Sequence, residues 1–424
     1  MNRFSFYMAI GMLATGGMFA GCSNDDEAPY PSPTPQPEEE PFVLKQRHDI
    51  VLNSLQKDGL IAQNDFAFRL FNIDVASTDK NSLLSPLSIT QCISLAANGA
   101  SEEVRDEIVG NFLPNGGSLD ELNTLHQYLV ESLTDVDNSS ILTLANSAWV
   151  DKDYKILSPF ADSIKGFYNA ESSELDFSSP KAVDKINGWV NETTNGLIPT
   201  IFETIPPMSK LILVNTMYFN GAWLSPFMKE LTEKSVFNNE DGKAVEVEFM
   251  SQTDRFDHVI TPDYSVAQLP YGNQAFSFYA LMPSEGTTLE LTAEKWSDIK
   301  KELEMGKVVI SLPKFEIQYE VREIPKKMEK AGLSKLFTTS GALGNTVTPA
   351  LPEGYVDMIH KTVFKVNEIG AEGAGLTGMG WAELGPEGGE TPKTPEIILN
   401  RPFIYIVEEQ STGAILFIGA VRNF

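Results

Sequence analysis

Apolar residues recur along the chain with two different periods. Near the start of the domain, the run NDFAFRLFNIDVA (64–76) places Phe66, Leu70 and Phe71 on one face of a helix. The run SPLSITQCISLAANGA (85–100) begins with Ser85 as the expected N-cap and Pro86 in the first turn. These two patterns predict helices.

Runs rich in β-branched and aromatic residues predict strands further along the chain. The last run contains a short EEQSTG turn, which predicts a C-terminal hairpin. The strand runs cover 141–150, 211–223, 276–283, 308–320 and 401–421, with helical runs at 182–196 and 322–337 between them. This mixture predicts an α+β fold with a large sheet.

One long segment fits neither period. Residues 367–397 (NEIGAEGAGLTGMGWAELGPEGGETPKTPEI) are rich in Gly, Ala and Thr, and they separate strand runs at 356–366 and 401–421. Long loops without secondary structure are uncommon inside compact domains and are often functional. The question of function is therefore centred on this loop.

The composition describes an acidic globular protein. Its 424 residues are 42% hydrophobic, and 32 Lys and Arg face 58 Asp and Glu, which gives a net charge of -26. Such a charge repels phosphate backbones, so no nucleic-acid partner is expected, and solubility is the simplest explanation of the charge. No repeat or second linker interrupts residues 42–424, which predicts a single domain there.

The N-terminus carries a targeting pattern. MNRFSFYMAIGMLATGGMFAGC has one Arg before an apolar run that ends in small residues, as in a secretory signal. Because FAGC closes it, the segment resembles a bacterial lipoprotein precursor, although Phe19 stands where Leu is usual. The resemblance implies a signal peptide over 1–21 and acylation of Cys22; a simple membrane anchor is the alternative.

Residues 22–41 form a Pro-rich acidic stretch, which predicts an extended tether between membrane and domain. Its first acids resemble the surface-export signal of some Gram-negative lipoproteins. We therefore expect a lipid-anchored protein of the bacterial cell envelope, at the outer membrane or the cell surface.

The sequence shows no catalytic motif. It lacks His-Glu-x-x-His, Gly-x-Ser-x-Gly and a Walker loop, and its four histidines have no metal-ligand spacing. Cys92 lies in an apolar helical run and is expected to pack as a small hydrophobe. We expect no metal or cofactor; a hydrolase whose triad is set by geometry alone is an alternative that activity assays would detect.

Six segments occur in the order and spacing of the serpin family, and the chain resembles that family over about 60–424. The segments are NSLLSPLSI, LVNTMYFNGAWLSPF, LPYGNQAFSFYALMP, VISLPKFEI, VDMIHKTVFKVNEIGAEG and RPFIYIVEEQSTGAILFIGAV. The resemblance implies three β-sheets surrounded by eight or nine helices, with an exposed reactive loop at about 368–397.

The resemblance also implies a function. Most serpins inhibit serine proteases as suicide substrates: the cleaved loop inserts as a strand into the main sheet and traps the acyl-enzyme. We therefore expect a target serine protease as the partner of a monomer that is not itself an enzyme. The alternative is a non-inhibitory serpin that acts as a binding or structural protein at the cell surface.

The loop meets the physical requirements of strand insertion. No proline occurs from Ile369 to Gly385, so each residue can donate a ladder hydrogen bond, and prolines return at Pro386. At about 3.3 Å per residue the segment would span on the order of 50 Å. One face would carry small residues, namely Ala371, Gly373, Gly375 and Thr377, and the other carries Glu372.

The hinge of the loop departs from the inhibitory pattern. EIGAEGAGLT keeps Glu368, Gly370, Glu372, Ala374 and Thr377, but Gly373, Gly375 and Leu376 stand where alanines are usual. Glycine lowers strand propensity and raises the entropy lost on ordering, which would slow insertion and favour substrate behaviour.

Family spacing also locates the bond that a protease would cut. Counting forward from Glu368 gives Leu384–Gly385, whereas counting back from Arg401 gives a position nearer Thr391. We favour Leu384, an apolar residue that suits chymotrypsin-like, elastase-like or subtilisin-like proteases better than trypsin-like ones.

Further residues match family positions that control insertion. A polar cluster beneath the opening sheet is matched by Ser85, Ser88, Asn215 and His360, which we call the sheet-opening cluster. Lys314 and Trp223 match the top of the sheet, where Lys314 would pair with Glu368. Core packing and surface pairing are the plain alternatives.

Overall fold

The computed structural model describes residues 43–287, 289–321, 323–351, 356–358, 360–371 and 393–424, and Leu44–Phe424 form one compact unit. The described residues contain nine α-helices and one 3₁₀ helix, η1 (Lys229–Leu231). The α-helices are α1 (Ser54–Ala76), α2 (Pro86–Ala97), α3 (Glu102–Phe112), α4 (Leu119–Asp135), α5 (Ser158–Tyr168), α6 (Pro180–Thr193), α7 (Ala293–Lys301), α8 (Ile324–Lys330) and α9 (Lys335–Thr338). None of them is long and apolar enough to cross a bilayer.

The helices predicted from periodicity are present. Phe66, Leu70 and Phe71 are buried on α1, and α2 starts at Pro86 directly after Ser85. The Ser85 side chain makes no capping bond; its hydroxyl donates instead to Met217 Sδ at 3.2 Å. The helical run at 322–337 is divided into α8 and α9 at Gly332, whose φ of +101° ends the first helix.

One large sheet has nine strands. In spatial order they are β1 (Ser82–Leu84), β18 (Ile415–Val421), β17 (Phe403–Glu409), β9 (Phe276–Pro283), β8 (Tyr264–Pro270), β7 (Ala244–Ile260), β10 (Glu304–Pro313) and β16 (Glu396–Ile398), while β6 (Glu233–Asn238) pairs with β7. The predicted C-terminal hairpin is β17–β18. Because the long strand β7 pairs with β6 and β10 along most of its length and with β8 at its end, these strands belong to one sheet.

The other large sheet, which we call the main sheet, consists of two parts. Its five-stranded part contains β13 (Val356–Met358), β5 (Leu211–Ala222), β2 (Ser140–Asp151) and β4 (Glu171–Leu175), with β15 (Gly370–Ala371) also beside β5. Its second part is the ladder of β11 (Phe315–Glu320) with β14 (Lys361–Val366). A small ladder joins β3 (Lys155–Ile156) and β12 (Val347–Thr348).

The strand run at 308–320 is divided at Lys314. β10 ends at Pro313 in the nine-stranded sheet, and β11 begins at Phe315 in the main sheet. Lys314 therefore lies at the junction of the two sheets.

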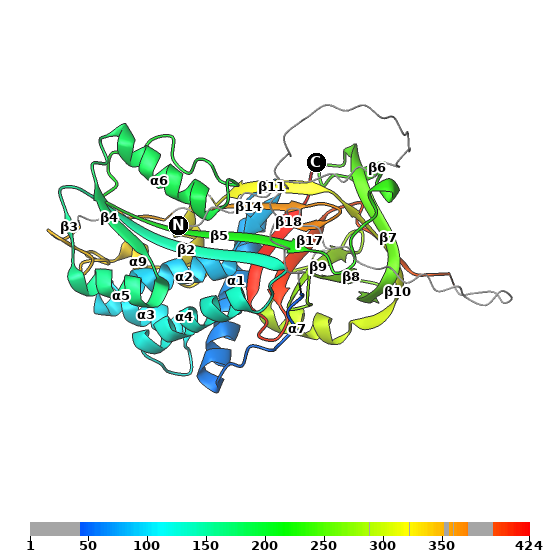
Figure 1. The fold of residues 1–424 in the computed structure, drawn as a ribbon, viewed down its shortest axis with the longest axis horizontal. Helices are drawn as coiled ribbons and strands as arrows, with labels where there is room; N and C mark the ends of the chain where they lie inside the picture. Colours follow the sequence, from blue (N-terminus) through cyan, green and yellow to red (C-terminus); the bar gives the residue numbers. More distant parts are fainter. Residues whose placement is uncertain (1–42, 288, 322, 352–355, 359, 372–392) are drawn as a thin grey trace, which may run out of the picture. The chain divides into compact units, whose positions relative to one another are not determined.

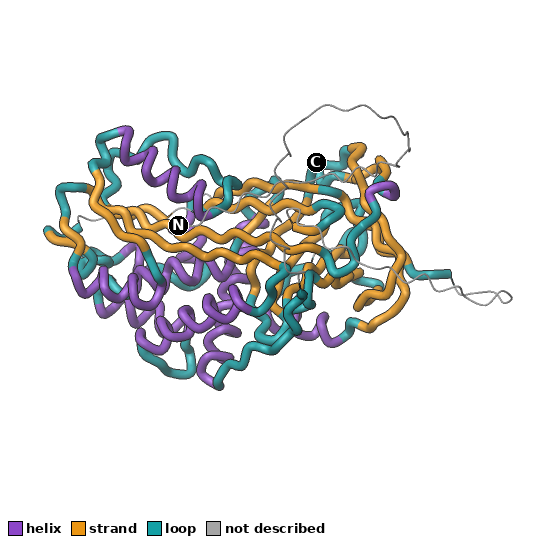
Figure 2. The backbone as a smooth tube through the Cα atoms, viewed as in Figure 1, coloured by secondary structure: helices purple, strands orange, loops and turns teal. Residues whose placement is uncertain are grey.

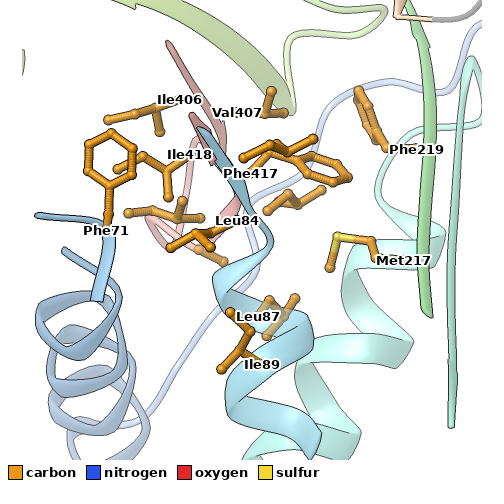
Figure 3. Close-up of a cluster of buried hydrophobic side chains, with 14 of the residues drawn as sticks. Phe71, Leu84, Leu87, Ile89, Met217, Phe219, Ile406, Val407, Phe417 and Ile418 are labelled. Atoms are coloured by element: carbon orange, nitrogen blue, oxygen red, sulfur yellow. The ribbon is translucent and has the colours of Figure 1, made fainter. Parts of the chain in front are cut away.

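Helices cover both faces of the main sheet. α6 lies on one side of β2 and β5, and α2, α3, α4 and α5 lie on the other (Figures 1 and 2). The buried core includes Phe71, Leu84, Met217, Phe219 and Phe417, which meet from α1, β1, β5 and β18 (Figure 3). Cys92 is buried in this core, as predicted. The α+β class with a large sheet is confirmed.

Candidate functional site

The two edges of β5 are paired very differently. One edge pairs with β2 along nearly its whole length, from Ser140–Gly221 to Val150–Leu211. Among the residues that the structure describes, the other edge is paired only at its ends: β13 pairs in parallel at Leu211–Leu213, and β15 pairs antiparallel at Gly221 and Ala222. Over described residues 361–366, β14 pairs with β11 and not with β5. The middle of this β5 edge is thus where a further strand can be added.

Asn367 turns the chain so that β15 can enter beside β5. Its Oδ1 accepts the backbone N–H groups of Ile369 at 2.9 Å and Gly370 at 3.2 Å, and its own N–H donates to the Gly370 carbonyl at 3.0 Å. Asx turns of this type suit asparagine because its short side chain reaches its own backbone. The turn directs Ala371 into the antiparallel ladder.

Gly370 cannot carry a side chain in this arrangement. Its φ of +155° lies in a region that other residues rarely adopt, and an added Cβ would lie 2.0 Å from the Gly221 carbonyl oxygen. The close approach of two backbones therefore requires glycine at the point of entry.

Glu368 and Lys314 form an ion pair at the top of the main sheet. Lys314 Nζ lies 3.1 Å from Glu368 Oε1 and 3.3 Å from Glu248 Oε2, and Thr232 Oγ1 donates to Glu368 at 2.9 Å. Burial opposes ionisation of Glu368, but hydrogen bonds from its backbone, Lys314 and Thr232 outweigh it and lower its pKa. Burial opposes ionisation of Lys314 as well, but its hydrogen bonds to Glu368 and Glu248 outweigh it and raise its pKa.

Trp223 is buried beside residues 367–369, which lead into β15. It is 1% exposed, stacks on Tyr271 at 4.4 Å between ring centroids, and donates from Nε1 to the Asn367 carbonyl at 2.9 Å. Its backbone N–H donates to the Ile369 carbonyl at 2.8 Å, and that of Phe227 donates to Glu368 at 2.9 Å. The structure thus brings Glu368, Lys314 and Trp223 together, as the resemblance implied.

In the sheet-opening cluster, Asn215 projects from β5 toward α2. Ser88 Oγ donates to Asn215 Oδ1. Asn215 Nδ2 donates to Gln91 at 3.2 Å and to Asn146 Oδ1, on β2, at 2.6 Å. Asn146 then donates to the Tyr168 carbonyl at 3.3 Å. These bonds fasten β5 to α2 and β2.

His360 fastens the opposite side of the gap to the same helix. Its Nε2 accepts the Ser85 backbone N–H at 3.0 Å and lies 3.0 Å from Thr362 Oγ1 on β14. Burial lowers the pKa of His360 to about 4, against a smaller opposing effect of Asp74, so the ring is neutral near pH 7. An accepting Nε2 agrees with this state.

No hydrogen bond among the described residues joins Asn215 to His360. Both line a cavity of about 10 Å³ with Ser88, which is near the space that one water molecule needs. The sheet-opening cluster therefore connects β5 and β14 through α2, since Ser85 is the N-cap residue of α2 and Ser88 lies in its first turn.

Sequence reasoning missed a buried ionic group beside this cluster. Asp74 is fully buried, Lys327 Nζ lies 2.5 Å from its Oδ1, and Tyr319 donates to its Oδ2 at 2.8 Å. These residues link α1, α8 and β11. A charged residue in each of two otherwise apolar helical faces was the available signal, but spacing alone could not pair residues so far apart in the chain.

The remaining predicted site residues lie outside the described residues. They are Cys22, Glu372, Gly373, Ala374, Gly375, Thr377, Leu384 and Gly385. In the part of the chain that is described, no group of three or more His, Cys, Asp or Glu side chains is placed to hold a metal ion.

Comparison with known proteins agrees with this architecture. A family model for Serpin (serine protease inhibitor) matches residues 61–424. A serpin-like protein of Thermococcus kodakarensis is 29% identical over all of this chain and 99% of its own length. Iripin-3 of Ixodes ricinus is 30% identical, over 88% of this chain and 97% of its own length.

A solved structure has the same fold. The thermophilic serpin Tengpin in its native state superposes with a TM-score of 0.76 and 26% identity, covering 90% of this chain and 98% of that one. Because the family model matches most of the chain, this protein belongs to the serpin family.

Proposed function

We propose that this serpin inhibits a serine protease as a suicide substrate. The attacking serine belongs to the protease, which forms an acyl-enzyme with the cleaved loop. Insertion of the loop as a strand beside β5 would carry the protease along the main sheet before the acyl bond is hydrolysed. The observation that carries the proposal is β15, because Gly370 and Ala371 already occupy ladder positions on the open edge of β5.

The register of β15 indicates how the strand would continue. Gly370 is opposite Ala222 and Ala371 is opposite Gly221. Since opposite residues in an antiparallel ladder share a face, continuing this register would bring Gly373 opposite Phe219 and Thr377 opposite Asn215. Small loop residues would thus meet large core side chains, and the Thr377 hydroxyl would reach the sheet-opening cluster.

The second candidate is a non-inhibitory serpin that acts as a binding or structural protein. Gly373 and Gly375 favour it, because glycines raise the entropy cost of ordering the loop into a strand. Slow insertion would release the protease with a cleaved serpin. The two candidates therefore differ in whether a covalent complex accumulates.

We place the scissile bond at Leu384–Gly385, with a position nearer Thr391 as the alternative. Leu384 is apolar and precedes Pro386, and no Lys or Arg occurs between Glu368 and Lys393. These features favour chymotrypsin-like, elastase-like or subtilisin-like targets over trypsin-like ones.

A gel experiment tests the proposal. Full-length protein in detergent is mixed with elastase, chymotrypsin, subtilisin or trypsin, and the products are separated under denaturing conditions. A band at the summed mass, with a released C-terminal peptide that begins at Gly385, supports trapping at the proposed bond. Cleavage by all four proteases without such a band would favour the non-inhibitory candidate.

We further propose that Cys22 carries a lipid that holds the domain at the cell envelope, at the outer membrane or cell surface. Support comes from the FAGC sequence and the Pro-rich stretch after it. Mass spectrometry of the mature N-terminus tests this: a diacylated or triacylated Cys22 is expected. Cys22→Ser should abolish the modification, and an unmodified Cys22 in the membrane fraction would contradict it.

A further inference from the structure

Two cations face each other on the exposed side of the nine-stranded sheet. Arg255 on β7 and Lys307 on β10 are directly opposite in the antiparallel ladder, and both are exposed. Opposite residues in such a ladder lie about 4.5–5.5 Å apart at Cα, where like charges destabilise the pair. A chain of net charge -26 does not need this pair for solubility.

Neither cation has an ionic partner within 4.0 Å in the described part of the chain. Asp254 uses its carboxylate to accept the Arg255 backbone N–H at 2.8 Å. Asp257 is the diagonal neighbour of Lys307, opposite Met305, and is partly buried. By contrast, Lys234 on β6 of the same sheet has Glu246 at 3.9 Å.

The face that carries the two cations continues into the strand that follows the reactive loop. Val309, two residues after Lys307, donates to the Pro395 carbonyl at 2.9 Å and pairs with Glu396 of β16. Exposed apolar side chains lie on the same face: Met305, two residues before Lys307, is 54% exposed, and Ile398, paired with Ser311 further along β10, is 39% exposed. β7 and β10 lie at the end of the fold away from α9 and β3 (Figure 1).

A protease held by the loop would reach this face. The proposed scissile bond is eight residues before Lys393, so it lies within about 30 Å of that residue even when extended. A protease of about 230 residues has a radius of gyration of about 17 Å. Its body would therefore cover the sheet end from which β16 emerges.

We propose that Arg255 and Lys307, with Met305 next to Lys307 and Ile398 further along the same face, form a docking surface for an acidic patch on the target protease. This inference rests on the proposed inhibitory function. The cations would attract the acidic patch before cleavage, and the apolar residues would pack against the surface around it. Such a surface raises the association rate without changing loop insertion.

The test separates docking from trapping. The probe is chymotrypsin whose lysines have been succinylated, which makes its surface acidic, and whose active-site serine has been converted to dehydroalanine, so that no cleavage occurs. Its affinity for full-length serpin is measured by fluorescence anisotropy at about 50 mM and about 500 mM NaCl. The double variant Arg255→Ser, Lys307→Ser is compared with Lys234→Ser, the matched cation on the same sheet.

We expect the double variant to bind the probe about fivefold more weakly at low salt, with a smaller difference at high salt and no change for Lys234→Ser. Equal losses in both variants, no loss, or no binding by the unaltered protein would overturn the docking surface. If heparin binds and loses affinity in the double variant while the protease probe does not, the face binds polyanions and the proposal is wrong. A failure of active chymotrypsin, subtilisin and elastase to form covalent complexes, with docking intact, would contradict only the inhibitory function.

Discussion

The top of the main sheet and the sheet-opening cluster both hold the boundary between β5 and β14, but they do so with different chemistry. At the top, the hinge is held by a charged pair that water can reach: Lys314 is 28% and Glu368 12% exposed at the side chain. In the cluster, the groups are neutral: His360 is 6% exposed and Asn215 is partly buried, and they bond to Ser85 and Ser88 at the start of α2 from either side.

This difference suggests an order of opening. Interactions at a partly exposed top can be exchanged for water at low cost, whereas buried polar groups must keep partners or lose several times more free energy. The entry of β15 at the top agrees with this order, since two residues are already paired while the sheet-opening cluster is intact. Each of the following predictions changes one side of the comparison.

The largest effect is expected at Gly370. In Gly370→Val, the added Cβ would meet the Gly221 carbonyl oxygen at 2.0 Å, so the hinge could not enter the ladder. We expect cleavage without trapping, with the number of serpin molecules consumed per protease inhibited rising at least about tenfold. Titration of a fixed amount of protease measures this ratio, and Ile369→Ala, at an exposed neighbouring side chain, is the control. A Gly370→Val variant that traps as efficiently as the unaltered protein would show that entry at β15 is not required.

The next largest effect is expected at Asn215. Asn215→Ala removes the partner of Ser88, Gln91 and Asn146, and we expect a loss of about 2–4 kcal/mol of native stability. Asn220→Ala, on the same strand, removes a single bond to Tyr218 and should cost about 1 kcal/mol or less. The midpoint of urea unfolding measures both. Similar losses in the two variants would mean that the hydrogen bonds of Asn215 in the sheet-opening cluster stabilise the native state no more than the single bond of Asn220 does.

The pH dependence of stability tests His360. Because its folded pKa is about 4 and its ordinary value is 6.5, the unfolded chain binds the proton more readily between these values. The contribution of His360 to stability should therefore fall as pH drops from about 6.5 to about 4, by up to about 3 kcal/mol, and change no further below that range. Burial lowers the pKa of His126 to about 3, which adds a second loss that extends to lower pH.

His360→Gln should reduce the slope of stability against pH within that window, whatever its effect on stability at pH 7. His48→Gln, at an exposed histidine, is the control and should leave the slope unchanged. An unaltered slope in His360→Gln would mean that His360 is not the group that titrates.

The sequence predicted some features of the molecule and not others. Period and composition predicted α1, β5 and the C-terminal hairpin, because each is a continuous run whose pattern reflects one buried face. The family resemblance brought Glu368, Lys314 and Trp223 together, since these residues stand in short motifs. It did not reveal Asn146 or the Asp74–Lys327 pair, because a single polar residue in an apolar run gives no indication of its partner.

The sequence also did not predict local backbone conformation at two positions. The run 308–320 reads as one strand, yet Lys314 divides it between two sheets, because the hydrophobic period does not record which sheet a strand joins. Likewise, Asn367 is one polar residue among many until its contacts with Gly370 are known.

The smallest effect is expected at Lys314. Lys314→Met keeps the length of the side chain but removes the charge beside Glu368 and Glu248, and a partly exposed pair of this kind contributes about 0.5–1 kcal/mol. In a domain of this size we expect the melting temperature to fall by only about 1–3 °C. Raising the salt concentration should narrow the gap between Lys314→Met and the unaltered protein, because screening weakens an exposed ion pair, but it should leave the deficit of Asn215→Ala unchanged. If Lys314→Met lost as much stability as Asn215→Ala, and if this loss did not depend on salt, the ion pair at the top of the main sheet would not be easier to exchange for water than the hydrogen bonds of the sheet-opening cluster.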